Sequence, residues 1–282
     1  MALRTIASVD DVAEHIDDPS WRLFDCRHDL TNPDAGADAY RLAHIRNAQF
    51  LHLDRDLSGA KNGTNGRHPL PDPATLADKL ARLGVSNDTE VIAYDDSGGM
   101  YAARLWWLLR YLGHERVALL DGGLGAWQRA GHALTQEAPD PRPAEFRWRA
   151  RLDTVDVDYI QAHLRQPSML VVDARSPERF RGENETLDLA GGHIPGAVNR
   201  FFKDNLSADG RFKPAVQLRR EFEDVLRGQP IESVVSQCGS GVTACHNLLA
   251  LEIAGLHGAR LYPGSWSEWC SDPQRPIARD NA

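Results

Sequence analysis

The sequence has few cysteines, no excess of positive charge and no long hydrophobic run. Four cysteines occur among 282 residues, and none stands in a Cys-x-x-Cys pair, which argues against a structural zinc site. A net charge of -8 disfavours a nucleic-acid-binding surface, because such surfaces use Lys and Arg to neutralise phosphates. No apolar run approaches the roughly 20 residues that a membrane-spanning helix needs, so we expect no membrane partner.

The start of the chain also lacks the pattern of a secretory signal. Residues 1–11 show no basic start followed by a hydrophobic segment. Irregularly spaced cysteines in a chain without such a signal favour reduced thiols, as in a cytoplasm. We therefore expect a cytoplasmic protein whose cysteines are free thiols, namely Cys26, Cys238, Cys245 and Cys270.

Residues 234–254 read as a buried strand, a cysteine, a glycine-rich turn and a helix. A β-branched apolar run ends at Cys238, and apolar residues recur at helical spacing from Ala244 onward. Gly239 and Gly241 allow backbone angles that let successive N–H groups point toward the sulfur, and the helix adds its positive end. Such a cradle favours an anion, so Cys238 is a candidate nucleophile. The alternative is a cysteine packed as a small hydrophobe.

Two catalytic classes use this combination of strand, cysteine, N–H-rich loop and helix. They are the cysteine phosphatases and the sulfurtransferases that carry sulfur as a persulfide. A phosphatase needs an arginine six positions after the cysteine to hold the phosphoryl oxygens, and that position here is Ala244. The loop therefore disfavours a phosphatase and favours sulfur transfer.

The loop from Cys238 to Ala244, which reads Cys-Gly-Ser-Gly-Val-Thr-Ala, resembles the active-site loop of the rhodanese superfamily. Within that superfamily it is most similar to the 3-mercaptopyruvate sulfurtransferases. Thiosulfate-preferring relatives usually carry basic side chains just after the cysteine, where this chain has Gly239 and Ser240. The resemblance thus implies a mercapto-acid donor, bound beside the loop residues Gly239, Gly241, Val242 and Thr243.

The chain repeats itself. An Asp-x-Arg unit and a later His-Ile unit occur in each half, and their first residues are Asp25 and His44, then Asp173 and His193. The nearly constant offset between the copies indicates a tandem duplication. Both units also occur in the half that lacks the cysteine. We therefore expect structural roles for Arg27, Arg175, His44 and His193.

A proline-rich segment separates the two halves. Prolines at positions 139, 141 and 143 favour an extended connector over a helix. We expect an amino-terminal rhodanese-like domain over residues 1–138, a linker over 139–150 and a catalytic carboxyl-terminal domain over 151–282. The first domain has Asp95 where the second has Cys238, so it is expected to be non-catalytic.

Short apolar strands alternate with helical patterns in both halves. The clearest helical patterns cover residues 73–83, 100–112 and 216–226. Such alternation is typical of an α/β fold. We therefore predict two tandem rhodanese-like domains, each with a mainly parallel sheet flanked by helices, and chemistry at the carboxyl ends of the strands, where Cys238 falls.

The donor's carboxylate needs a cation. The family places an arginine after the first strand of the second domain, and the matching residue is Arg179, whose planar fork suits a carboxylate. The alternative is a solvated arginine. Mercaptopyruvate-type relatives often carry a second arginine before the Gly-His-Ile-Pro motif, but residues 182–191 are short and acidic here. Arg181 is a candidate substitute.

The same resemblance implies a proton relay. In the mercaptopyruvate enzymes the loop serine works with a histidine and an aspartate of the first domain, and the matching positions are Ser240, His68 and Asp54. Such an array can protonate a departing pyruvate enolate. His68 lies beside a proline in a Gly- and Asn-rich stretch, so an exposed surface histidine is the alternative.

The leading hypothesis is a sulfurtransferase that needs no metal or organic cofactor. Cys238 takes sulfur from a small donor, 3-mercaptopyruvate or thiosulfate, and passes it to cyanide or a thiol. A thioredoxin-like reductant is a further expected partner. The alternatives are a thiosulfate sulfurtransferase, or a persulfide-carrying regulatory module with little small-molecule turnover.

Overall fold

The computed structural model describes residues 3–151 and 154–279. The described residues leave out positions 1–2, 152–153 and 280–282, which touch the ends of the two expected domains. The chain divides into two compact units. Unit 1 comprises Met1–Gly59, Leu70–Leu152 and Ala208–Phe212, and unit 2 comprises Ala60–Pro69, Asp153–Ser207 and Lys213–Ala282. Each unit therefore includes a short segment from the sequence range of the other.

Unit 1 is built on a five-stranded sheet in which every pairing is parallel. Its strands, in the order β1-β5-β4-β2-β3, are Ile6–Ala7, Val117–Leu120, Glu90–Tyr94, Trp21–Asp25 and Ala48–Phe50. All five residues of β4 are buried, as expected for a central strand covered on both faces. The carboxyl ends of the strands meet at one edge, which carries Asp25 and Asp95.

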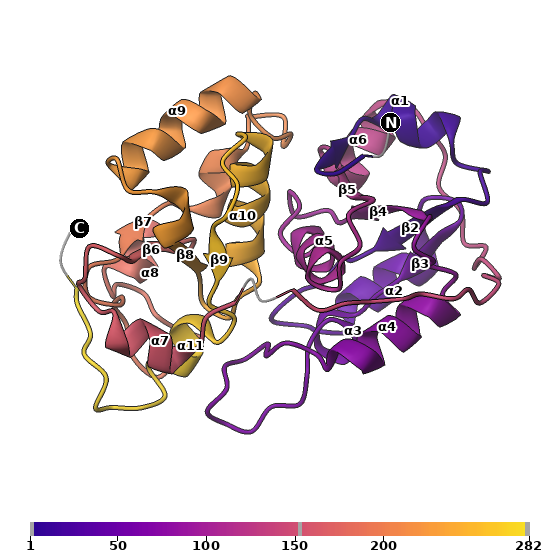
Figure 1. The fold of residues 1–282 in the computed structure, drawn as a ribbon. Coiled ribbons are helices and arrows are strands. Elements are labelled where there is room, and N and C mark those ends of the chain that lie inside the picture. The colour runs from indigo at the N-terminus through magenta and orange to yellow at the C-terminus, as the bar shows by residue number, and fades with distance from the viewer. Residues whose placement is uncertain (1–2, 152–153, 280–282) are drawn as a thin grey trace. The chain divides into compact units, whose positions relative to one another are not determined.

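Six helices flank this sheet, and two of them confirm helical patterns expected from the sequence (Figure 1). They are α1 (Val9–Glu14), α2 (Ala35–Leu42), α3 (Leu53–Asp56), α4 (Pro73–Arg82), α5 (Ala102–Tyr111) and α6 (Gly123–Arg129). Helix α4 starts where Asp72 caps the N–H of Thr75 at 2.8 Å, with Pro73 in the first turn. Apolar residues of α1 and α6 form one core cluster with the strands.

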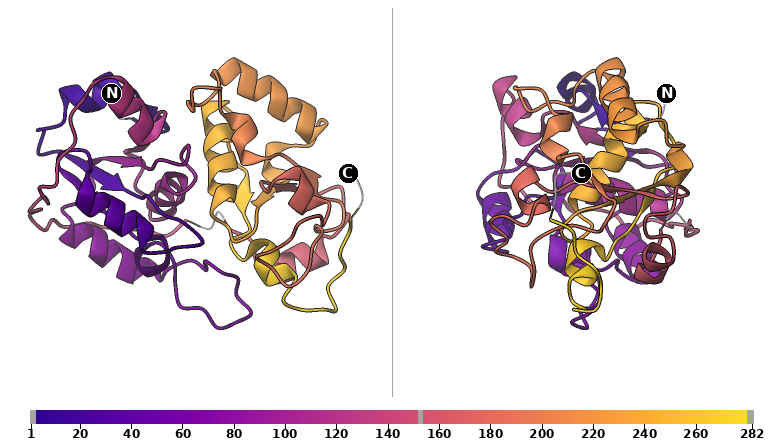
Figure 2. Two further views of the ribbon diagram at one scale, coloured as in Figure 1. Left: turned by 180° about the vertical axis from the view of Figure 1, so that it is seen from behind. Right: turned by 90° about the vertical axis from the view of Figure 1, so that its left-hand side faces the viewer.

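Unit 2 repeats the design with four parallel strands (Figures 1 and 2). In the order β7-β6-β8-β9 they are Val198–Asn199, Leu170–Asp173, Val234–Gln237 and Arg260–Leu261. The helices are α7 (Val157–Ala162), α8 (Pro177–Phe180), α9 (Ala215–Leu226), α10 (Thr243–Ile253) and α11 (Ser265–Trp269), with 3₁₀ turns at Phe202–Asn205 and Ile231–Ser233. The expected helix over residues 216–226 is thus present as α9, and the expected strand and helix around Cys238 are β8 and α10.

The repeated Asp-x-Arg units form matching buried ion pairs. The guanidinium of Arg27 binds the carboxylate of Asp25 and donates to the carbonyl of Ala43 at 2.7 Å. Arg175 does the same in unit 2, with Asp173 and the carbonyl of Gly192 at 2.7 Å. Each arginine ties a strand end to the segment before the His-Ile unit, which agrees with the structural role expected for both.

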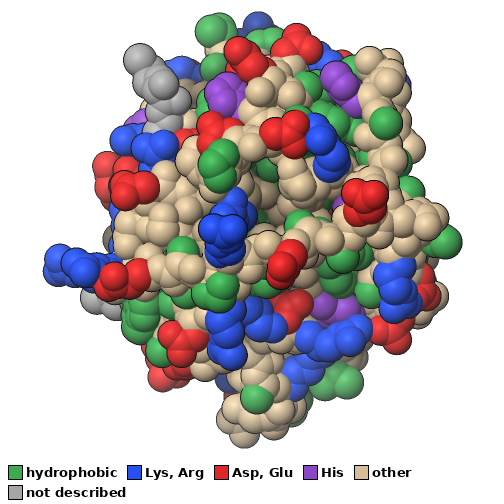
Figure 3. Space-filling view, turned by 90° about the vertical axis from the view of Figure 1, so that its right-hand side faces the viewer, with side chains coloured by type: hydrophobic (Ala, Val, Ile, Leu, Met, Phe, Trp, Pro, Cys, Tyr) green, Lys and Arg blue, Asp and Glu red, His purple; other side chains and the backbone are tan. Residues whose placement is uncertain are grey.

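Within the part of the chain that the structure describes, no helix has the length and apolar character to cross a bilayer. Acidic and basic side chains share the face drawn in Figure 3.

Candidate active site

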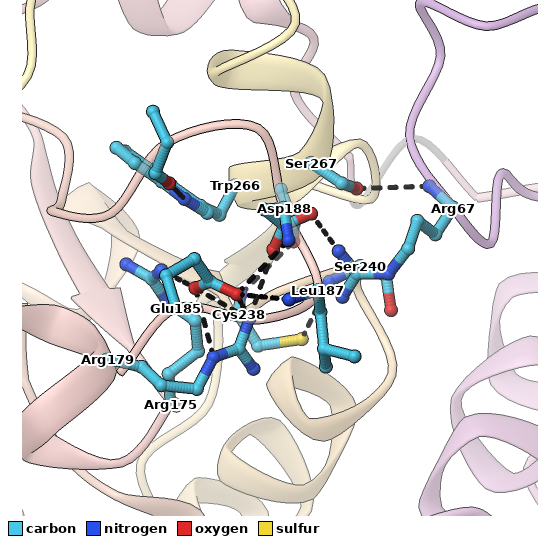
Figure 4. A network of polar contacts seen from close by, with 12 residues as sticks. Arg67, Arg175, Arg179, Glu185, Leu187, Asp188, Cys238, Ser240, Trp266 and Ser267 are labelled. Atoms are coloured by element: carbon cyan, nitrogen blue, oxygen red, sulfur yellow. Dashed lines mark hydrogen bonds and ion pairs between the residues drawn. The ribbon is translucent and has the colours of Figure 1, made fainter. Parts of the chain in front are cut away.

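Cys238 directly follows β8 and begins the loop that leads into α10. Its side chain is buried, and its sulfur accepts the backbone N–H of Ser240 at 3.4 Å and that of Gly241 at 3.1 Å (Figure 4). The amino-terminal turn of α10, which starts at Thr243, adds its positive end to these two donors. The sulfur of Cys238 therefore faces backbone N–H groups of its own loop, the arrangement that the two glycines predict.

Gly241 is required for the shape of this loop. Its φ of +77° lies in the left-handed region that favours glycine. A Cβ at this position would lie 2.4 Å from the carbonyl oxygen of Pro263, so the loop packs directly against the backbone before α11. Replacing Gly241 would therefore move the N–H group that faces the sulfur of Cys238.

The start of α11 holds the other side of the loop. The hydroxyl of Ser265 accepts the N–H of Cys238 at 3.1 Å and donates to the carbonyl of Tyr262 at 2.9 Å. The N–H groups of Trp266 and Ser267 donate to the carbonyls of Cys238 and Gly239 at 3.0 and 2.9 Å. The backbone on both sides of the sulfur is thus fixed by α11, a contribution that sequence reasoning missed because these residues come 27 or more positions later.

Ser240 and His68 meet in unit 2. The Nδ1 atom of His68 lies 2.7 Å from the hydroxyl oxygen of Ser240, and both side chains are buried. His68 reaches this place because the segment Ala60–Pro69 belongs to unit 2. The alternative interpretation of His68 as an exposed surface histidine is wrong, since only 4% of it is exposed.

Asp54, the third residue of the expected relay, lies on α3 in unit 1. Its carboxylate is 3.8 Å from Nε2 of His28, and its backbone N–H donates to Nδ1 of His52 at 3.1 Å. The structure thus brings Ser240 and His68 together, whereas the part that Asp54 plays in a relay stays a prediction.

The ligand atoms of His28, His52 and Asp54 lie within 4.8 Å of one another, a spacing that could hold a metal ion. Nδ1 of His52 accepts the N–H groups that begin α3, and its Nε2 lies 3.0 Å from the carbonyl of Pro33. With Nδ1 accepting and Nε2 donating, His52 has no lone pair left for a metal ion. His52 therefore caps α3, and the three residues do not fit a metal centre.

Arg179 lies on α8 and is bound by two carboxylates of the following segment. Its Nε and Nη2 atoms contact the carboxylate of Glu185 at 2.9 to 3.0 Å, and Nη2 contacts Asp188 at 3.0 Å. Arg179 is therefore not the solvated arginine of the alternative interpretation. Arg181, the candidate substitute for the second arginine, instead forms an exposed pair with Glu183, so that suggestion lacks support.

Arg67 is the charged residue near Cys238 that the sequence analysis did not single out. Its guanidinium pairs with Asp188, and its backbone N–H donates to the hydroxyl of Ser267 at 3.0 Å (Figure 4). Burial and then the nearby charge of Arg179 lower the pKa of Arg67 from its ordinary value. Its place directly before His68 in the sequence was the one local signal that could have pointed to it.

Comparison with known proteins shows a family relationship over both halves of the chain. A family model described as a rhodanese-like domain matches residues 8–130 and again 156–272. The chain is 48% identical over 281 residues, 99% of each chain, to a probable 3-mercaptopyruvate sulfurtransferase of Pseudomonas aeruginosa. It is 35% identical to the thiosulfate sulfurtransferase of Mus musculus, covering 89% of this chain and 85% of that protein.

The structure is also similar to a solved 3-mercaptopyruvate sulfurtransferase from Leishmania major. The TM-score is 0.85 at 32% sequence identity, and the match covers 97% of this chain and 75% of the other. Both halves of the chain match the same family model, and the similarity to named relatives extends over nearly all of it. The protein therefore belongs to the family of rhodanese-like domain proteins.

Proposed function

We propose that this protein is a sulfurtransferase that moves sulfane sulfur from 3-mercaptopyruvate to a thiol or cyanide through a persulfide on Cys238. The observation that carries the proposal is the sulfur of Cys238 facing the N–H groups of Ser240 and Gly241, at the end of a parallel strand and the start of a helix. The family relationship supports sulfur transfer.

The first half-reaction loads the cysteine. The thiolate of Cys238 attacks the sulfur of 3-mercaptopyruvate, a sulfur–sulfur bond forms, and the bond from that sulfur to carbon breaks. The electron pair of the broken bond leaves on the pyruvate enolate, which takes up a proton to become pyruvate. The N–H groups of the loop hold the negative charge on the sulfur of Cys238 before attack.

The proton in this step is the role proposed for Ser240 and His68. Their 2.7 Å contact provides a direct route for a proton from the imidazole through the hydroxyl to the enolate carbon. We further propose Asp54 as the group that orients the relay.

Arg179 is proposed to bind the carboxylate of the donor, with Gly239, Gly241, Val242 and Thr243 lining the space next to the sulfur. A guanidinium presents a fork of N–H donors that matches a carboxylate. The ion pairs of Arg179 with Glu185 and Asp188 support this assignment, because they are contacts with the same chemical group.

The second half-reaction returns the cysteine to its thiolate. A thiolate or cyanide attacks the outer sulfur of the persulfide, and the sulfur–sulfur bond breaks with its electron pair returning to Cys238. We propose a thioredoxin-like reductant as one such thiol, and a cytoplasm as the compartment that keeps the cysteines reduced. The negative net charge supports small molecules and proteins over nucleic acid as partners.

We propose the catalytic domain to be residues 151–282, joined by the linker 139–150 to a non-catalytic domain of residues 1–138. Asp95 stands in the first domain where the second has Cys238, and a carboxylate there cannot become a persulfide. The segment around His68 is the part of the first sequence half that contributes to the catalytic unit.

The proposal is tested by incubating the reduced protein with 3-mercaptopyruvate alone and measuring its mass. We expect the protein to gain the mass of one sulfur atom at Cys238, and a second addition of cyanide to remove it as thiocyanate. An unchanged mass with both 3-mercaptopyruvate and thiosulfate would refute the proposal. Stoichiometric loading without steady-state turnover would identify a sulfur carrier instead.

Thiosulfate is the second candidate donor, because relatives that are 35% identical to this chain are named thiosulfate sulfurtransferases. A comparison of kcat/KM for the two donors decides between them. We expect 3-mercaptopyruvate to be preferred, because the Ser240–His68 pair serves a donor whose leaving group needs a proton, whereas sulfite leaves as a stable anion. A higher value for thiosulfate would overturn this choice of donor.

A further inference from the structure

We propose that Glu185 is a positioning residue of the donor site. Its carboxylate holds one edge of the Arg179 guanidinium and thereby directs another edge toward the residue next to Cys238. The inference rests on the proposed function, because it takes Arg179 as the cation that binds the carboxylate of the donor. It adds the residue that sets the orientation of this cation.

Two edges of the Arg179 guanidinium have different surroundings. Nε and Nη2 both donate to Oε2 of Glu185, at 3.0 and 2.9 Å, and Nη2 also lies 3.0 Å from Oε1. A Cβ at Gly239 would lie 3.5 Å from Nη1 and 3.5 Å from Nη2. Glu185 therefore occupies the edge formed by Nε and Nη2, whereas the edge formed by Nη1 and Nη2 approaches the residue that follows Cys238.

The edge near Gly239 still has a donor for a ligand. Nη2 contacts Asp188 at 3.0 Å, but among the described residues no hydrogen bond or ion pair involves Nη1 of Arg179. The side chain of Arg179 is 22% exposed, so a small anion can reach it. Because a guanidinium is planar and its N–H groups have fixed directions, holding one edge also sets where the other edge points.

Glu185 is itself held by the segment that carries it. Its Oε1 accepts the backbone N–H groups of Leu187 and Asp188, at 2.9 and 3.1 Å. Its side chain is only 4% exposed, whereas that of Arg179 is 22% exposed. The carboxylate is thus fixed to the backbone before any donor binds, as a positioning residue has to be.

Arg175 connects Glu185 with the end of the sheet (Figure 4). Its Nη1 lies 3.7 Å from Oε2 of Glu185, and its guanidinium binds Asp173, the last residue of β6. It also lies over the ring of Trp266, 4.7 Å from the ring centre. Glu185 is therefore placed between an arginine that is fixed to a strand and Arg179, the arginine proposed to bind the donor.

Unit 1 forms the same structural Asp-x-Arg pair without this addition. Residues 28–40, which follow Arg27, contain neither glutamate nor arginine. The pair of Glu185 and Arg179 therefore belongs to the half of the sequence that carries Cys238. Because the duplicated scaffold forms in unit 1 without such a pair, we assign the pair to the chemistry of the site and not to the folding of the domain.

Two roles of Glu185 predict opposite effects on affinity. A carboxylate that merely competes with the donor for Arg179 would weaken binding, so its removal would lower KM. A carboxylate that positions Arg179 strengthens binding, because without it the donor has to order a long side chain. Ordering one such side chain on binding lowers affinity by roughly three- to tenfold.

The experiment compares E185Q with wild type and with E183Q. The control removes the same charge from the same segment, where Glu183 forms an exposed pair with Arg181. KM and kcat are measured for 3-mercaptopyruvate, and the Kd of pyruvate is measured by calorimetry. We expect E185Q to raise KM and Kd by roughly three- to tenfold with kcat changed much less, and E183Q to resemble wild type. A lowered or unchanged KM in E185Q would overturn the proposal.

A double variant tests whether Glu185 acts through Arg179. In R179K the ammonium group has no fork to orient, so adding E185Q to R179K should raise KM much less than adding it to wild type. If the two changes instead multiply, Glu185 acts independently of Arg179 and the proposal is wrong.

Differences in folding do not obscure the result. Partial unfolding of a variant lowers kcat and the calorimetric stoichiometry, but it leaves KM and Kd unchanged. Should E185Q fail to fold, E185D, which keeps the charge and shortens the side chain, is measured in its place with the same expected direction. Because pyruvate binding needs no turnover, it tests Glu185 even if Cys238 fails to load sulfur, which would refute only the proposed function.

Discussion

Two loops in corresponding places of the duplicated fold enclose different acidic side chains. In unit 1 the loop after β4 wraps the carboxylate of Asp95, which accepts four backbone N–H groups at 2.8 to 2.9 Å from Ser97, Gly99, Tyr101 and Ala102. In unit 2 the loop after β8 offers two N–H groups to the sulfur of Cys238. The same strand–loop–helix design thus holds a buried carboxylate in one unit and, in the other, the sulfur that we propose to be the nucleophile.

The difference lies in the loops and not in the scaffold beneath them. The pairs Asp25–Arg27 and Asp173–Arg175 have the same closest ion-pair distance of 2.7 Å and the same position at the end of a strand. The carboxylate of Asp95 accepts four N–H groups, whereas the sulfur of Cys238 accepts two and is the atom proposed to attack the donor. Four predictions sharpen this comparison, starting with the largest expected effect.

Replacing Cys238, the acidic residue of the unit 2 loop, should abolish sulfur transfer. In C238S the hydroxyl is not ionised near neutral pH and cannot form a persulfide, so we expect sulfur loading to be undetectable and turnover to fall by about a thousandfold or more. Mass spectrometry after incubation with 3-mercaptopyruvate measures the loading. C245A, which changes a buried cysteine of α10, should still gain one sulfur, and loading of C238S would contradict the assignment of the nucleophile.

Replacing Asp95, the acidic residue of the unit 1 loop, should instead lower the stability of the fold. D95A leaves four buried N–H groups without their acceptor, and we expect a loss of about 2–4 kcal/mol in the free energy of unfolding. Urea denaturation measures this value. D96A, at the exposed neighbouring position, should change it by less than about 0.5 kcal/mol. Equal effects of the two variants would mean that the Asp95 loop is not a structural joint.

Ser240 and Ser97 lie two positions after Cys238 and Asp95, and we expect their replacement to have different effects on activity. S240A removes the hydroxyl that contacts His68, so we expect kcat for 3-mercaptopyruvate to fall by about a hundredfold, with little change for thiosulfate. S97A, the equivalent change in unit 1, should leave both rates as they are. An equal loss with both donors in S240A would show that Ser240 shapes the loop and relays no proton.

The smallest predicted effect concerns a charge cluster on α9 of unit 2. Burial alone would raise the pKa of Glu221, but hydrogen bonds from Arg200, Gln217 and Lys213 outweigh it and lower the pKa to about 2. A lowered folded-state pKa gives stability that is present above the unfolded pKa and is lost as the pH falls from about 4.5 to about 2.

E221Q should therefore be less stable than wild type by about 1 kcal/mol at pH 7, a value reduced for solvent screening, and the difference should vanish near pH 2. Denaturation at a series of pH values measures this. E223Q on the same helix removes an exposed pair with Arg219 and should show no comparable pH-dependent difference. A difference in E221Q that does not depend on pH would rule out the ion pairs as its cause.

Local sequence determined the elements and the nucleophile. The periodicity of apolar residues predicted α4, α5 and α9, and the glycines around Cys238 predicted a loop of inward N–H groups, because each of these features depends on residues close together in the chain. The repeated Asp-x-Arg unit likewise predicted a structural role for its arginine. The contact of Arg175 with Asp173 is local, since the two residues are only two positions apart.

The tertiary structure decided which distant side chains complete the site. His68 reaches Ser240 across 172 positions, and Arg67 reaches Asp188 across 121. It also pairs Arg181 with Glu183, a contact that leaves the suggested substitute without support. No local pattern encodes such contacts, because they depend on where the segment Ala60–Pro69 packs within unit 2. One short stretch of sequence therefore predicts the nucleophile, whereas folding decides which charged side chains lie around it.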